Sequence, residues 1–141
     1  MSRPFVAVAV ALAALLGQAH ASDMSSHVMA MCPMSVTGTV VAASDVVNGE
    51  ALTFTTGGEV AELRTRVRAM AKIHNEPHAG NAMNGESMPA SRATVTDVEG
   101  GATLLFVPSA AGDLEEIQAA IRASVERMRR DGCEMMGQTR R

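Results

Sequence analysis

The chain has 141 residues with 12 basic and 15 acidic side chains, and it contains neither Trp nor Tyr. A net charge of −3, no basic stripe and three Phe as the only aromatic residues exclude the usual surface of a nucleic-acid-binding protein. A chain of this length can bury one modest core, so we expect a single domain.

The first 21 residues have the pattern of a cleaved secretion signal. Arg3 precedes an uncharged apolar run at residues 5–16, and Ala19-His20-Ala21 supplies small residues for a cut before Ser22. The apolar run is shorter than the about 20 residues that a hydrocarbon core requires. We therefore predict an exported chain, periplasmic or secreted, with no membrane span after processing.

The body of the chain has an internal similarity at an offset of 52 residues. The aligned pairs are Asp45 with Asp97, Gly49 with Gly101, Leu52 with Leu104 and Phe54 with Phe106. We predict a duplicated β-β-α unit. An N-terminal segment at 22–38 precedes repeat 1 (39–75), a loop (76–90) and repeat 2 (91–133), which is followed by a tail at 134–141.

Each repeat contains two segments with the composition of strands. Residues 39–47 and 50–56 flank Asn48-Gly49, and residues 92–99 and 102–107 flank Gly100-Gly101. Glycine at these places favours a tight hairpin turn, because type I′ turns require positive φ at both central residues. Asp45 and Asp97 precede the turns, where a turn-stabilising role is favoured over catalysis.

A helix with one apolar stripe is predicted after each hairpin. The stripes comprise Val60, Leu63, Val67, Ala71 and His74 in the first helix, and Leu114, Ile117, Ile121, Val125 and Met128 in the second. Pro77 should end the first helix. Asp113 with Glu116 forms a predicted capping box on the second helix, and Gly132 a predicted C-terminal cap.

These elements predict an α+β fold in which a four-stranded antiparallel sheet carries two helices on one face. Because each helix follows an equivalent hairpin, we expect the two C-terminal helix ends to lie on the same side of the sheet.

Sulfur and imidazole side chains collect outside the predicted core. Ten of the 11 Met residues lie beyond the secretion signal, most of them in the N-terminal segment, the long loop and the C-terminal end. Thioether, thiolate and imidazole donors suit Cu(I) and similar soft ions. The predicted ligands are Cys32 and Met34, joined by Met70, His74, His78 and Cys133.

The segment Met31-Cys32-Pro33-Met34 resembles the Cys-Pro-Met segment of short heavy-metal-binding modules attached to periplasmic copper and silver efflux proteins. Ser35 stands where a His commonly follows in those modules. The resemblance covers four residues and implies Cu(I) or Ag(I) binding. It favours a metal-binding protein for storage, delivery or resistance, with a metal-delivery or efflux protein as partner.

Two alternatives stay open at this point. Cys32 and Cys133 are the only cysteines, and one disulfide is the default for such a pair in an exported protein. The chain would then be a disulfide-stapled binding or structural module without metal, with adaptable Met side chains on its surface. As an alternative to a metal ligand, His74 is a boundary residue that caps its helix or bonds a carbonyl. No catalytic motif is present, so we predict that the protein is not an enzyme.

Overall fold

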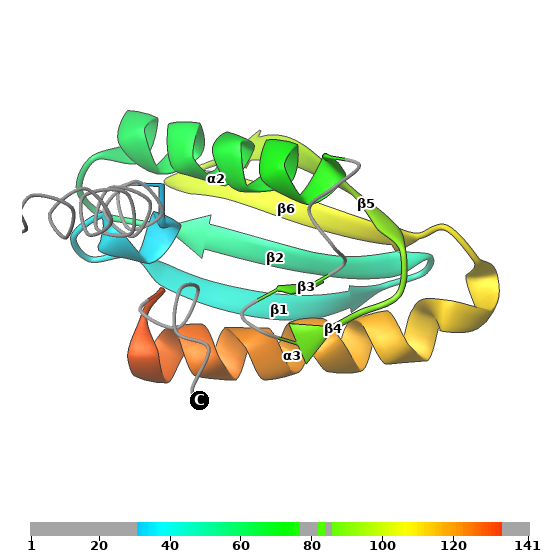
Figure 1. Cartoon of the computed structure of the whole chain (residues 1–141). Coiled ribbons are helices and arrows are strands. Elements are labelled where there is room, and N and C mark those ends of the chain that lie inside the picture. Colours follow the sequence, from blue (N-terminus) through cyan, green and yellow to red (C-terminus); the bar gives the residue numbers. More distant parts are fainter. Residues whose placement is uncertain (1–30, 77–81, 84–85, 134–141) are drawn as a thin grey trace, which may run out of the picture.

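The structure is a computed structural model that describes residues 31–76, 82–83 and 86–133 (Figure 1). The predicted secretion signal, most of the N-terminal segment and the tail at 134–141 lie outside the described residues. Within the described part of the chain, no helix combines the length and apolar character needed to cross a membrane.

Four strands form one antiparallel sheet with the order β1-β2-β6-β5, and two long helices accompany it. The strands are β1 (Val40–Val46), β2 (Gly49–Thr55), β5 (Ser91–Val98) and β6 (Gly101–Pro108), and the helices are α2 (Val60–Asn75) and α3 (Leu114–Asp131). The short elements are η1 (Pro33–Ser35), η2 (Ala111–Asp113), β3 (Ala82–Met83) and β4 (Glu86–Ser87). The predicted α+β class and antiparallel sheet are confirmed, whereas the internal duplication stays a prediction.

Each helix packs mainly on the hairpin that it does not follow. Helix α2 follows β2 and packs on β5 and β6, while α3 follows β6 and packs on β1 and β2. Because β2 and β6 pair antiparallel, the chain enters the two helices at opposite ends of the sheet, and the helices run in opposite directions (Figure 1). The expectation that both C-terminal helix ends lie on one side was therefore wrong.

The core lies between the sheet and the two helices. Phe54 and Phe106 are fully buried on the helix-facing side of the central strands, where the predicted alternation placed them. Burying such a side chain contributes about 1.5–3 kcal/mol. On the other side of the same strands the Thr53 and Thr103 hydroxyls lie 2.9 Å apart, so the two central strands also contact through polar groups.

Both hairpin turns come one residue earlier than predicted. Gly49 pairs with Val46 and Gly101 pairs with Val98, so these glycines belong to strands. A Cβ atom on either glycine would overlap the backbone carbonyl of the neighbouring central strand. Gly100, with φ of 73°, occupies the turn itself. Gly49 and Gly101 are thus required for the close approach of β2 and β6.

The predicted C-terminal cap of α3 is confirmed, but its predicted capping box is wrong. Gly132 has a positive φ of 63°, and its N–H donates to the Met128 carbonyl at 2.9 Å. At the other end Asp113 makes no capping side-chain hydrogen bond. Asp113 closes the preceding turn η2 and has ψ of 5°, so its backbone is not extended as an N-cap residue requires.

The segment between the repeats contributes to the core, which the loop prediction did not anticipate. Strands β3 and β4 pair through Ala82 with Ser87 and Met83 with Glu86. Met88, which follows them, is 4% exposed and joins the core cluster. This methionine is therefore a packing residue, although its place in a Gly- and Asn-rich stretch gave no sign of a core to fill.

Candidate functional site

The two cysteines meet at one end of the molecule as a disulfide. Cys32 and Cys133 have Cα atoms 6.0 Å apart, and both are buried. Cys32 directly precedes η1, and Cys133 follows Gly132 at the end of α3. The turn at Gly132 carries the chain from α3 toward the N-terminal segment, so the disulfide ties the two together. Sequence reasoning had left this pairing open against a metal site.

Met34 lies close to the disulfide in sequence, but its side chain is turned to the core. It belongs to η1, is half-buried and packs against the core cluster. The turn begins with buried Pro33 and is closed by the Ser35 N–H, which donates to the Cys32 carbonyl at 3.1 Å. Pro33 thus fixes the backbone between Cys32 and Met34.

The two predicted ligands on α2 make other contacts. Met70 is 8% exposed and belongs to the core. His74 Nε2 lies 3.0 Å from Ser91 Oγ and 3.2 Å from the Ser91 carbonyl, and the imidazole stands edge-on to Phe106. Burial lowers the pKa of His74, and the Ser91 hydrogen bond partly offsets this effect. The imidazole is therefore neutral near pH 7 and anchors the end of α2 to β5.

The six predicted ligands do not form one described cluster. Arg66 on α2 donates to the Cys32 carbonyl at 3.1 Å, which places that turn of the helix beside the disulfide. His74 lies about 12 Å further along the axis at 1.5 Å per residue, and His78 lies outside the described residues. No group of three or more His, Cys, Asp or Glu able to hold a metal occurs in residues 31–76, 82–83 and 86–133.

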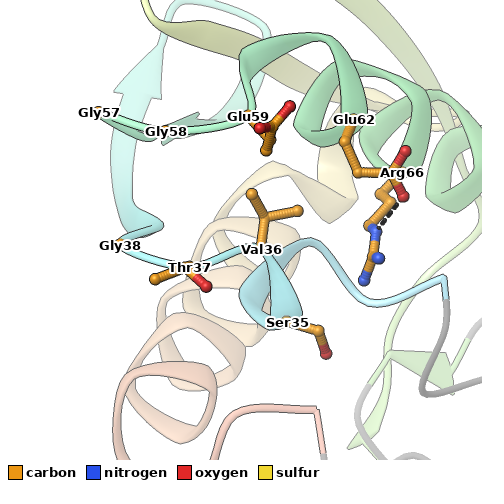
Figure 2. Close-up of a pocket in the computed structure, with 9 residues that line it drawn as sticks. All are labelled: Ser35, Val36, Thr37, Gly38, Gly57, Gly58, Glu59, Glu62 and Arg66. Carbon is orange, nitrogen blue, oxygen red and sulfur yellow. Dashed lines mark hydrogen bonds and ion pairs between the residues drawn. The ribbon is translucent and has the colours of Figure 1, made fainter.

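A hollow of about 650 Å³ opens between the segment at 35–38 and the start of α2 (Figure 2). One wall is the N-terminal segment and the other is the start of α2; the lining residues are Ser35, Val36, Thr37, Gly38, Gly57, Gly58, Glu59, Glu62 and Arg66. Thr56 joins the walls, since its hydroxyl donates to the Thr37 carbonyl at 2.8 Å and accepts from the Gly58 N–H at 3.1 Å.

Arg66 connects the hollow with the disulfide. Its Nε donates to Glu62 at 2.8 Å, one helical turn earlier, while Nη1 reaches the Cys32 carbonyl. The Arg66 side chain is only 19% exposed. Sequence reasoning missed this residue, because a helical arginine normally belongs to the solvated face. Two features of the sequence could have indicated it. Glu62 and Arg66 stand one helical turn apart, and the Gly57-Gly58 pair comes just before the helix.

Asp45 and Asp97 each accept hydrogen bonds from an arginine on the helix packed over their hairpin. Arg122 of α3 contacts Asp45 at 2.6 Å, and Arg68 of α2 contacts Asp97 at 2.6 and 2.7 Å. These carboxylates therefore join sheet to helix, a role that the turn-based prediction did not include.

Comparison of the chain with protein-family models, curated proteins and solved structures finds no match.

Proposed function

We propose that the protein is an exported binding module closed by one disulfide, and that it is not an enzyme. The observation that carries this proposal is the Cys32–Cys133 disulfide, which spans 101 residues of sequence. Closing a loop of about 100 residues in the unfolded chain corresponds to about 4.7 kcal/mol of stabilisation in the chain-entropy model. Disulfides persist in oxidising compartments, which agrees with the predicted secretion signal.

The disulfide also supports one wall of the hollow. Cys32, the Arg66 contact to its carbonyl and the Thr56 contact to Thr37 together hold the N-terminal segment against the start of α2. The segment contains only the short turn η1 and no strand within residues 31–39. Burial of Val36 in the core and these few links fix its position, so the disulfide contributes to the shape of the hollow.

The proposed ligand is a short basic peptide segment of a partner protein. Gly38, Gly57 and Gly58 line the hollow without side chains, which leaves backbone groups accessible to an extended chain. Glu59 adds an exposed carboxylate at the rim, whereas the carboxylate of Glu62 is already paired with Arg66 at 2.8 Å. Hydrogen bonds from the backbone would give affinity, and the Glu59 carboxylate would select Lys or Arg.

A titration followed by ¹⁵N NMR tests this function. The probes are pentapeptides that carry a central Lys, with the same peptides carrying a central Glu as the charge-reversed control. We expect saturable shifts of the amides at 35–38 and 57–62 with the Lys peptides only. Glu59→Lys should abolish these shifts, whereas Glu115→Lys at the exposed start of α3 should not. Equal shifts with both peptide sets, or none, would overturn the proposal.

The second candidate function is binding of Cu(I) or a similar soft ion, for storage, delivery or resistance. The observation in its favour is that reduction would leave two thiols on Cα atoms 6.0 Å apart, with Met34 two residues from Cys32. Two thiolates are donors that suit Cu(I), and the Met34 thioether would join them only if its side chain turned out of the core. Met70 and His74 are not part of this smaller site, because they lie farther along α2.

Cu(I) titration against a chromophoric competitor separates the two candidates. The stapled-module proposal expects no retention by the oxidised protein beyond the micromolar range. The metal proposal expects tight retention by the reduced protein, loss in Cys32→Ser with Cys133→Ser, and no change in His74→Gln. Tight retention by the oxidised protein would contradict the stapled module, and weak retention by the reduced protein would rule out the metal function.

A further inference from the structure

Glu50 is a carboxyl group buried in the interior of the fold. Its side chain is fully inaccessible on the helix-facing side of β2. Neither carboxylate oxygen accepts a hydrogen bond from a donor in the described part of the chain, and the Asp45 carboxyl is the group with which a protonated Glu50 can form one. Burying an ionised carboxylate without such partners is costly, so the protonated form is favoured at this position.

The surroundings of Glu50 contain one more acid and one base. Asp45 is its cross-strand neighbour on β1, and Phe106 is its neighbour on β6. From α3 above, Arg122 pairs with Asp45 at 2.6 Å, and Gln118 donates to the Gly49 carbonyl at 3.1 Å. Asp45 and Arg122 are thus the charged groups that act on Glu50, and Arg122 is already engaged by Asp45.

We propose that Glu50 is a pH-responsive contact beneath α3, which holds the helix on the β1–β2 hairpin when protonated and loosens it when ionised. An ionised Glu50 would add a second negative charge beside Asp45, and one arginine would have to balance both carboxylates. Water that enters between the β1–β2 hairpin and α3 would solvate the added charge and weaken the repulsion between the two carboxylates. This inference is independent of the proposed function, since the hollow and the disulfide take no part in it.

The direction of the pH dependence follows from the charge balance. Burial first, and then the neighbouring Asp45 carboxyl, raise the pKa of Glu50 from 4.5 to about 7 against the opposing charge of Arg122. Between pH 4.5 and about pH 7, Glu50 of the folded chain holds a proton that the unfolded chain has lost. The stability that protonated Glu50 contributes is therefore complete in acid, falls as the pH rises toward 7, and levels off above it.

Helix α2 provides an internal control for this effect. It packs on the β5–β6 hairpin, where Ala102 occupies the position that corresponds to Glu50 at the offset of 52 residues. Ala102 is fully buried and cannot ionise. The first half of α2 should therefore keep its packing while the first half of α3 responds to pH.

Amide hydrogen exchange measured at pH 6 and pH 8, corrected for intrinsic rates, tests the proposal. In the native sequence we expect the opening equilibrium of amides 117–122 in α3 to rise roughly 10-fold over this interval. Amides 63–68 in α2 should change little. Glu50→Gln should remove the response of α3, whereas Glu126→Gln, which alters an exposed carboxylate on the same helix, should leave it intact.

A direct titration keeps the test decisive even if Glu50→Gln does not fold. The ¹³Cδ resonance of Glu50 in the native sequence should titrate above pH 6. A midpoint below pH 5, or an unchanged α3 response in folded Glu50→Gln, would overturn the proposal.

Discussion

Helix α3 on hairpin β1–β2 and helix α2 on hairpin β5–β6 form two regions with similar contacts and different charge. In each region a polar side chain of the helix donates to a glycine carbonyl: Gln118 to Gly49 at 3.1 Å, and Arg64 to Gly101 at 2.9 Å. In each region an arginine also pairs with an aspartate of the hairpin.

The regions differ in how many carboxylates each arginine must balance. Asp97 has Arg68 at 2.6 Å and Arg64 at 3.8 Å, and the residue beneath the helix is Ala102. Asp45 has Arg122, and the residue beneath that helix is Glu50. The same sheet-to-helix geometry therefore has an excess of positive charge over the β5–β6 hairpin and, once Glu50 ionises, an excess of negative charge over the β1–β2 hairpin.

Removal of the Cys32–Cys133 disulfide should lower the free energy of unfolding more than any other change considered below. The disulfide joins the end of α3 to the segment that Arg66 of α2 contacts, so it holds both helices to one end of the fold. Cys32→Ser with Cys133→Ser should lower the free energy of unfolding by up to about 4.7 kcal/mol, as measured in urea. Reduced native protein is the matched control. A loss below about 1 kcal/mol would mean that the staple does not couple the regions.

The next effect distinguishes the regions by pH. The contribution of Glu50 to the free energy of unfolding should fall by about 2–3 kcal/mol between pH 5 and pH 8, because the pKa of Glu50 is raised to about 7. Glu50→Ala, which copies Ala102, should remove this fall. Urea unfolding across the pH range measures it, and an unchanged slope in the variant would show that the two regions are electrostatically alike.

His74 should give the α2 region a smaller pH dependence of opposite sign. Burial lowers its pKa, so the unfolded chain binds a proton that the folded chain excludes, and stability is lost as the pH falls through 6.5. His74→Gln should flatten the acid side of the stability profile and leave the alkaline side unchanged. A flat acid side in the Glu50→Ala variant, which lacks the opposing titration of Glu50, would contradict this assignment.

The smallest effect concerns the exposed ion pairs. Arg68→Ala should cost less than about 1 kcal/mol, because the pair is solvent-exposed and Arg64 remains near Asp97. Arg122→Ala should raise the pKa of Glu50 further, because the opposing positive charge is lost. NMR titration of Glu50 in both variants measures the two effects. An equal change in the pKa of Glu50 in Arg68→Ala and in Arg122→Ala would contradict the predicted difference between the two regions.

The sequence predicted the elements well because they depend on local patterns. Alternation placed Phe54 and Phe106 on one face, and Gly132 ended α3 as expected. The turns were placed one residue late, since a glycine next to Asn48 has the pattern of a turn whether it is needed for positive φ or for lack of a Cβ. Only the register of β2 against β6 separates these causes.

The site was harder to predict because it depends on how distant elements meet. The sequence identified Cys32 and Cys133 as a pair but could not place His74 away from them. That separation follows from the antiparallel pairing of β2 and β6, which sends the helices in opposite directions. Glu50 carried no signal either, because a strand glutamate next to a turn is normally solvated.

One intact-mass measurement tests both the proposed export of the chain and its closure by the Cys32–Cys133 disulfide. The full-length chain is produced in a bacterial host with a periplasm, and the protein recovered from that compartment is denatured in iodoacetamide without reductant. We expect the mass of a chain that begins at Ser22 and carries no alkyl group. After reduction the same chain should gain two alkyl groups. A chain that retains residues 1–21, or that carries two alkyl groups before reduction, would contradict it.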